Sequence, residues 1–110
     1  MKFDNIKADV KKVELDIMRM DNENYFEAVI DHERLEGMIR VLEGIFGPPA
    51  WPSDKKLSKY IEGLIKDAGG LRKGQTLYFL DEEECLAFAM LWPWQDGKRI
   101  TIKIAKILRR

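Results

Sequence analysis

Apolar and polar residues alternate in two short segments near the start of the chain, residues 13–17 and residues 25–30. A period of two is typical of a half-buried strand. The polar residues between the segments suit a turn, and we expect Asn22 and Glu23 to form a two-residue loop. We therefore predict a β-hairpin whose apolar side chains share one buried face: Val13, Leu15, Ile17, Phe26, Ala28 and Ile30.

Two later segments have apolar residues at spacings of three and four, which is the period of an amphipathic helix. Asp31 is placed to cap the first helix and Gly47 to end it, whereas Ser53 or Asp54 would cap the second and Gly69 would end it. The apolar stripe of the first helix comprises Leu35, Met38, Ile39, Leu42, Ile45 and Phe46. The stripe of the second comprises Leu57, Tyr60, Ile61, Leu64, Ile65 and Ala68.

The last third of the chain returns to strand patterns, over residues 75–80, 85–92 and 99–108. Asp96 followed by Gly97 indicates a hairpin between the last two strands, because this dipeptide fits a type I′ turn. A turn at that position assigns the side chains to two faces. One face would hold Phe88, Met90, Trp92, Trp94, Arg99, Thr101, Lys103 and Ala105. The other would hold Ala87, Ala89, Leu91, Pro93, Ile100, Ile102 and Ile104.

These elements follow the order ββααβββ, and we treat residues 1–110 as a single domain. We predict an α+β fold in which five strands form an antiparallel sheet and both amphipathic helices pack on one face. The small and aliphatic face of the last hairpin is the surface that such helices would cover. If the final strand lies at the sheet edge, Lys103 and Lys106 protect that edge from aggregation, or else the edge pairs in a homodimer.

The mixed aromatic and basic face of the last hairpin is the main clue to function. One interpretation is a second small core beneath the Pro-rich connection between the helices. A second is a protein interface, since Trp, Met and Arg are enriched at interface centres. A third is a platform that stacks the bases of single-stranded nucleic acid. We prefer them in that order, and the candidate binding residues are Trp51, Met90, Trp92, Trp94, Arg99 and Lys103.

Charge and composition narrow the choice of partner. The 19 basic and 19 acidic side chains give a net charge of zero, which excludes capture of nucleic acid or an anionic membrane by overall charge. The charge is segregated, however: residues 97–110 carry six bases and no acid, and residues 81–96 carry five acids and no base. A single cysteine excludes an internal disulfide, and no signal-like segment begins the chain, so we expect a reducing, cytoplasmic setting without membrane contact.

Residues for common catalytic chemistry are scarce. The chain has one histidine, His32, one cysteine, Cys85, and two serines, which leaves no evident pairing of nucleophile and base and no zinc-ligand set. We therefore expect no metal and no cofactor. The predicted function is a non-enzymatic interaction or ligand-binding module whose partner is another protein or a second copy. The alternatives are single-stranded nucleic-acid binding on the same face and a small enzyme that uses carboxylates near His32.

Overall fold

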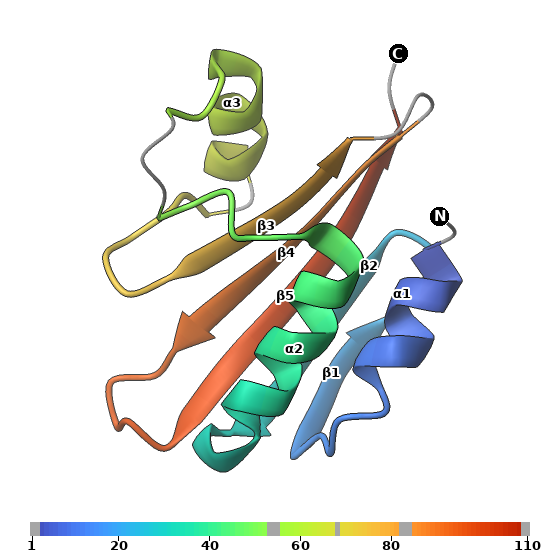
Figure 1. The fold of residues 1–110 in the computed structure, drawn as a ribbon, viewed down its shortest axis with the longest axis vertical. Helices are drawn as coiled ribbons and strands as arrows, with labels where there is room; N and C mark the ends of the chain where they lie inside the picture. The colour runs from blue at the N-terminus through green and yellow to red at the C-terminus, as the bar shows by residue number, and fades with distance from the viewer. Residues whose placement is uncertain (1–2, 53–55, 68, 82–84, 109–110) are drawn as a thin grey trace.

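The chain folds into one antiparallel sheet with helices against it (Figure 1). The computed structural model describes residues 3–52, 56–67, 69–81 and 85–108. The strands are β1 (Ile17–Asp21), β2 (Tyr25–Asp31), β3 (Thr76–Asp81), β4 (Cys85–Pro93) and β5 (Arg99–Leu108), in the spatial order β1-β2-β5-β4-β3. The helices are α1 (Phe3–Val10), α2 (Leu35–Phe46) and α3 (Lys59–Asp67), with a 3-10 turn, η1, at His32–Arg34. The α+β class and the five-stranded antiparallel sheet are thus confirmed.

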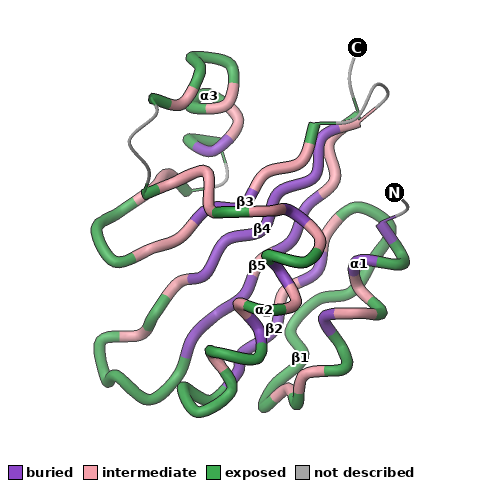
Figure 2. The backbone as a smooth tube through the Cα atoms, in the orientation of Figure 1, coloured by how far each residue is buried: buried purple, intermediate pink, exposed green. Residues whose placement is uncertain are grey.

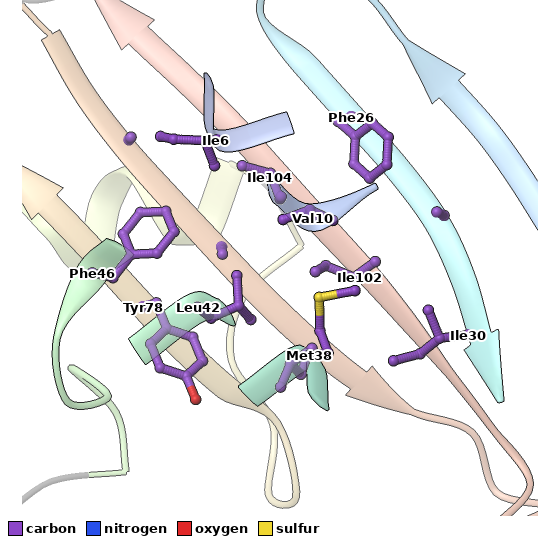
Figure 3. Close-up of a cluster of buried hydrophobic side chains, with 14 of the residues drawn as sticks. Ile6, Val10, Phe26, Ile30, Met38, Leu42, Phe46, Tyr78, Ile102 and Ile104 are labelled. Carbon is purple, nitrogen blue, oxygen red and sulfur yellow. The ribbon is translucent and has the colours of Figure 1, made fainter. Parts of the chain in front are cut away.

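The main core lies on the face of the sheet that α1 and α2 cover. We call this the first face and the opposite one the second face. Buried positions concentrate in β2, β4 and β5 (Figure 2), and Figure 3 shows the helix side chains above them. The rings of Phe46 and Tyr78 meet at 6.2 Å between centroids and join α2 to β3. The core comprises Phe3, Ile6, Val10, Phe26, Ala28, Ile30, Met38, Leu42, Phe46, Tyr78, Ala87, Ala89, Leu91, Ile100, Ile102 and Ile104.

Helix α2 ends as predicted, but the predicted cap Asp31 lies before the 3-10 turn η1, and the α-helix itself begins at Leu35. The Asp31 carboxylate accepts a hydrogen bond from the Glu33 backbone N–H at 2.9 Å and caps the turn η1 that leads into the helix. Gly47 has a φ of +80° and ends the helix, and its N–H donates to the Glu43 carbonyl at 2.9 Å. The predicted stripe faces the main core, and its residues Met38, Leu42 and Phe46 are buried there.

Helix α1 was not predicted from the sequence, and it precedes the first predicted strand. Its apolar residues Phe3, Ile6 and Val10 are buried in the main core, at a spacing that suits one helix face. The ammonium groups of Lys7 and Lys11 contact the Asp21 carboxylate at 2.7 and 2.5 Å and tie α1 to the end of β1. Hydrogen bonds from Lys11 and Lys7 lower the pKa of Asp21 below its ordinary value.

Helix α3 packs on the second face of the sheet, whereas both helices were expected on one face. Its buried Ile65 contacts a second core that is formed with Leu77, Phe88, Met90 and Ala105. The chain passes from the first face to the second through the connection after α2, which runs along the outer edge of β3. The N–H groups of Ala50 and Trp51 donate to the Leu77 carbonyl at 2.8 and 3.3 Å, and the Leu77 N–H donates to the Trp51 carbonyl at 2.8 Å. The chain therefore passes around this edge before α3 begins.

The start of α3 differs in detail from the predicted helix. The Ser58 hydroxyl accepts a hydrogen bond from the Ile61 N–H at 3.2 Å, as a capping residue does. Tyr60, a member of the predicted stripe, is 53% exposed, because α3 buries only a narrow strip against the second core. The predicted caps Ser53 and Asp54 and the last stripe residue Ala68 lie outside the described residues.

The register of the C-terminal hairpin agrees with the prediction. Met90 pairs with Lys103, Trp92 pairs with Thr101, and the Trp94 N–H donates to the Arg99 carbonyl at 2.9 Å. The turn is different from type I′, which needs a positive φ at two residues. Only Gly97 has one, at +69°, and the Asp96 carboxylate instead accepts from the backbone N–H groups of the two residues after Gly97 at 2.8 and 3.3 Å.

The N-terminal hairpin is shifted from the predicted register. The Asn22 N–H donates to the Tyr25 carbonyl at 2.9 Å, and the Asn22 side chain accepts from the N–H groups of Asn24 and Tyr25, which moves the tip by one residue. A bulge between Met18 and Met20 then shifts the register by one residue in the opposite direction, and this change moves Ile17 to the other face. Ile17 consequently pairs with Val29 on the second face and is 45% exposed, although the sequence predicted it in the core.

The final strand, β5, lies at the centre of the sheet between β2 and β4, which corrects the suggestion that it forms an edge. Lys103 and Lys106 therefore do not protect an edge, and this strand is not open to pairing in a homodimer. The two edges are β3, which the Trp51 segment partly covers, and β1, whose five residues are all exposed (Figure 2). Among the described residues, no helix is long and apolar enough to cross a membrane.

Candidate binding surface

The aromatic and basic face of the C-terminal hairpin is divided by α3 into a covered half and an open half. In the covered half, Met90 is completely buried, and Ile65 of α3 and Trp51 pack in the same cluster. This half corresponds to the second small core that the sequence suggested, and α3 covers it together with the connection that holds Trp51. Met90 therefore lies beneath the surface, and Trp51 lies at the β3 edge, so neither joins the other candidate residues on the open half.

Trp94 is the central aromatic residue of the open half. Its indole Nε1–H donates to the Thr101 hydroxyl at 2.8 Å, which fixes the ring across the neighbouring strand. The guanidinium carbons of Arg19 and Arg99 lie 5.6 and 5.7 Å from the ring centroid, within the range of cation–π contact. Arg99 also contacts the Asp16 carboxylate at 3.1 Å. The predicted stacking of Arg99 on Trp94 is thus present, and Arg19 adds a second cation.

Trp92 is held tightly at the boundary between the two halves. The ammonium nitrogen of Lys103 lies 3.4 Å from its ring centroid. On the loop after α3, a Cβ at Gly69 would come within 2.9 Å of the Trp92 Cη2 atom, so only glycine lets the loop approach the ring this closely. The Trp92 Nε1 atom is buried and has no hydrogen-bond partner among the described residues.

Strand β1 adds exposed apolar side chains that the sequence did not assign to this surface. Ile17 and Met20 are 45% and 48% exposed, and their partners Val29 and Glu27 lie on the second face of β2. Arg19 contacts Glu27 at 3.5 Å and reaches Trp94 from the same strand. We name Ile17, Arg19, Met20, Trp94 and Arg99 the open surface. No local signal marks the bulge that turns Ile17 outward.

Tyr25 borders the open surface on β2. Its hydroxyl donates to the Glu27 carboxylate at 2.5 Å. Burial and this carboxylate together raise the pKa of Tyr25 well above its ordinary value, because both disfavour the phenolate. The hydroxyl is therefore a fixed donor, and Glu27 is held between Tyr25 and Arg19.

A groove adjoins the open surface at the hairpin end. Its volume is about 640 Å³, and it lies between the loop that follows α3 and the end of the C-terminal hairpin. Among the described lining residues, the loop contributes two cations, Arg72 and Lys73, and the hairpin contributes one acid, Asp96. The lining residues are Arg72, Lys73, Gly74, Gln75, Trp92, Pro93, Trp94, Gln95, Asp96 and Thr101.

Several carboxylates lie near His32, and each of those described below already contacts an arginine or caps a turn. His32 is exposed, and the nearby hollow of about 190 Å³ includes Glu14, Asp16 and Asp31. Glu14 contacts Arg34, Asp16 contacts an arginine of β5, and Asp31 caps η1. No group of three or more potential metal ligands occurs in the part of the chain that the structure describes.

The histidine and the cysteine lie far apart. Asp31, which precedes His32, pairs with one end of β5, and Cys85 pairs with Leu108 at the other end. At a rise of about 3.3 Å per residue, the nine steps along β5 separate them by about 30 Å. A catalytic pairing of the two side chains is therefore excluded. Comparison of the chain with protein-family models, curated proteins and solved structures finds no match.

Proposed function

We propose that the protein is a non-enzymatic interaction module of the cytoplasm that binds another protein through the open surface. The observation that carries this proposal is the gathering of exposed Ile17 and Met20 beside half-buried Trp94, with Arg19 and Arg99 against its ring. Aliphatic, aromatic and guanidinium groups in this combination are typical of interface centres. The unpaired Cys85 is in keeping with a reducing compartment.

The partner segment that fits this surface is an extended strand with apolar residues at alternate positions and a carboxylate near them. Among the described residues, no strand pairs with the outer edge of β1, whereas the other edge, at β3, pairs with Trp51. A strand added to β1 would satisfy its free backbone groups. Its alternate side chains would extend the apolar surface of Ile17 and Met20, and an acid would meet Arg19.

The test compares partners captured from native lysate by the wild-type chain and by Met20→Lys, with Tyr60→Lys as the matched control. Tyr60 is similarly exposed, at 53%, but lies on α3 away from the open surface. Loss of an interface anchor weakens binding by about tenfold or more. We expect Met20→Lys to lose partners that both the wild type and Tyr60→Lys retain.

Two results would contradict the proposal. One is an unchanged set of partners for Met20→Lys at equal folded concentration, checked by circular dichroism. The other is a wild-type dimer in light scattering that Met20→Lys converts to monomer, because the occupant of the open surface would then be a second copy.

A further inference from the structure

The groove beside the hairpin is rich in hydrogen-bond donors that lack acceptors. Neither Arg72 nor Lys73 makes a salt bridge with any other described residue. Gln75 accepts from the Arg72 N–H through its Oε1 at 2.8 Å, and its N–H donates to the Arg72 carbonyl at 3.0 Å. These two bonds close the loop and hold its two cations at one wall of the groove.

Two further features favour an anionic ligand. The buried Nε1–H of Trp92, a groove residue, has no acceptor among the described residues, and buried donors in proteins are normally satisfied. Asp96, the one acid among the described lining residues, is occupied at Oδ1 by two backbone N–H groups. With two cations against one acid, the lining is complementary to negative charge.

We propose that this groove binds a nucleoside phosphate, either free or as part of a single strand. Arg72 and Lys73 are suited to the phosphate, since charge-assisted hydrogen bonds to phosphate are among the strongest that side chains make. The indoles of Trp92 and Trp94 form the aromatic side of the groove, which suits a planar base. The volume of about 640 Å³ lies within the range of small-ligand sites.

The acidic residue Asp81 does not oppose an anion at this place. Asp81 pairs with Leu86 near the start of β4, where Cys85 lies, and Trp92 lies near the other end of the same strand. Seven steps of about 3.3 Å place Cys85 about 23 Å from Trp92, which is beyond the Debye length of about 8 Å at physiological salt. The nucleotide proposal also goes beyond the protein contact proposed above, because Arg72 and Lys73 lie outside the open surface.

The experiment follows the fluorescence of the three tryptophans and their indole N–H resonances in the full chain at low salt. The probes are AMP, a short oligo(dT), adenosine and inorganic phosphate. We expect AMP or oligo(dT), or both, to saturate with a shift of the Trp92 indole resonance, and adenosine and phosphate to bind more weakly. Binding of AMP identifies a free nucleotide as the ligand, and binding of oligo(dT) alone identifies a single strand.

The double variant Arg72→Gln, Lys73→Gln is expected to weaken binding by about tenfold or more, since it removes two charged contacts. The matched control, Lys56→Gln with Lys59→Gln, removes the same charge from exposed positions elsewhere and should bind like the wild type. Met20→Lys should also bind the nucleotide normally, which separates this test from that of the protein contact.

Three results would overturn the nucleotide proposal. These are the absence of saturable binding of both AMP and oligo(dT) up to about 1 mM, phosphate binding as tight as that of AMP, and equal weakening by the two double variants.

Discussion

The packing of α3 on the second face can be tested by a pair of double-mutant cycles. Ile65 of α3 shares the second core with Met90, whereas Met38 of α2 lies in the main core on the opposite face. The two methionines are both completely buried, so Met38→Ala is a matched control for Met90→Ala. Each is combined with Ile65→Ala.

The expected magnitudes follow from burial and contact. Truncation of a buried Ile or Met to Ala costs about 2–5 kcal/mol in free energy of unfolding, and Ile65 is only 3% exposed. Residues that share a cavity show interaction energies of about 0.5–3 kcal/mol, whereas independent sites add within about 0.5 kcal/mol. We expect Ile65 and Met90 to be coupled, and Ile65 and Met38 to be additive.

Urea denaturation monitored by circular dichroism gives the four free energies of each cycle. Because two such truncations approach the total stability of a small domain, all variants are measured in the same concentration of a stabilising osmolyte. Additivity of Ile65 with Met90, together with coupling of Ile65 to Met38, would refute the placement of α3 on the second face.

Three other measurements test local features. Gly69→Ala should lower the free energy of unfolding by about 1–3 kcal/mol, because the added Cβ would collide with Trp92 and the backbone φ of +112° is strained for alanine. Gly63→Ala lies within α3 and has open space around it, so it should raise the free energy of unfolding by about 0.5–1 kcal/mol. Urea denaturation measures both changes. Asp21→Asn should lower stability at neutral pH by less than about 1 kcal/mol; since the lysines of α1 lower the pKa of Asp21 below 3.8, the difference from wild type should vanish as the pH falls below that value in an acid denaturation series. Burial raises the pKa of Tyr78 above 10.0, so wild-type stability should fall as the pH rises above 10.0, and the tyrosinate absorbance of Tyr78, measured as the difference from Tyr78→Phe, should appear together with unfolding rather than before it.

The parts of the fold that could be predicted are those in which several local signals agree. In the C-terminal hairpin, alternation in both strands and a glycine at the turn give one register, and Trp92 pairs with Thr101 as expected. In the N-terminal hairpin, the extra residue at Arg19 carries no local signal, because either register places apolar residues at alternate positions. One undetected bulge therefore changed the face of Ile17.

The course of α3 depended on contacts between residues that are distant in sequence. The hydrogen bonds of Ala50 and Trp51 with Leu77 direct the chain around the β3 edge, and no periodicity within α3 reports which face it will cover. The same dependence decides which candidate residues are buried. The sequence placed Met90 and Trp92 on the same face, as observed, but only the position of α3 determines that Met90 is buried and Trp92 borders the open surface.

Photo-crosslinking shows whether the open surface contacts another protein. A photoreactive residue is placed at Met20, and in a separate chain at the equally exposed Tyr60, and the adducts formed in native lysate are compared at equal chain concentration. We expect a discrete adduct with another protein from position 20 and none of the same mass from position 60. Adducts of equal yield from both positions, or from position 60 alone, would contradict it.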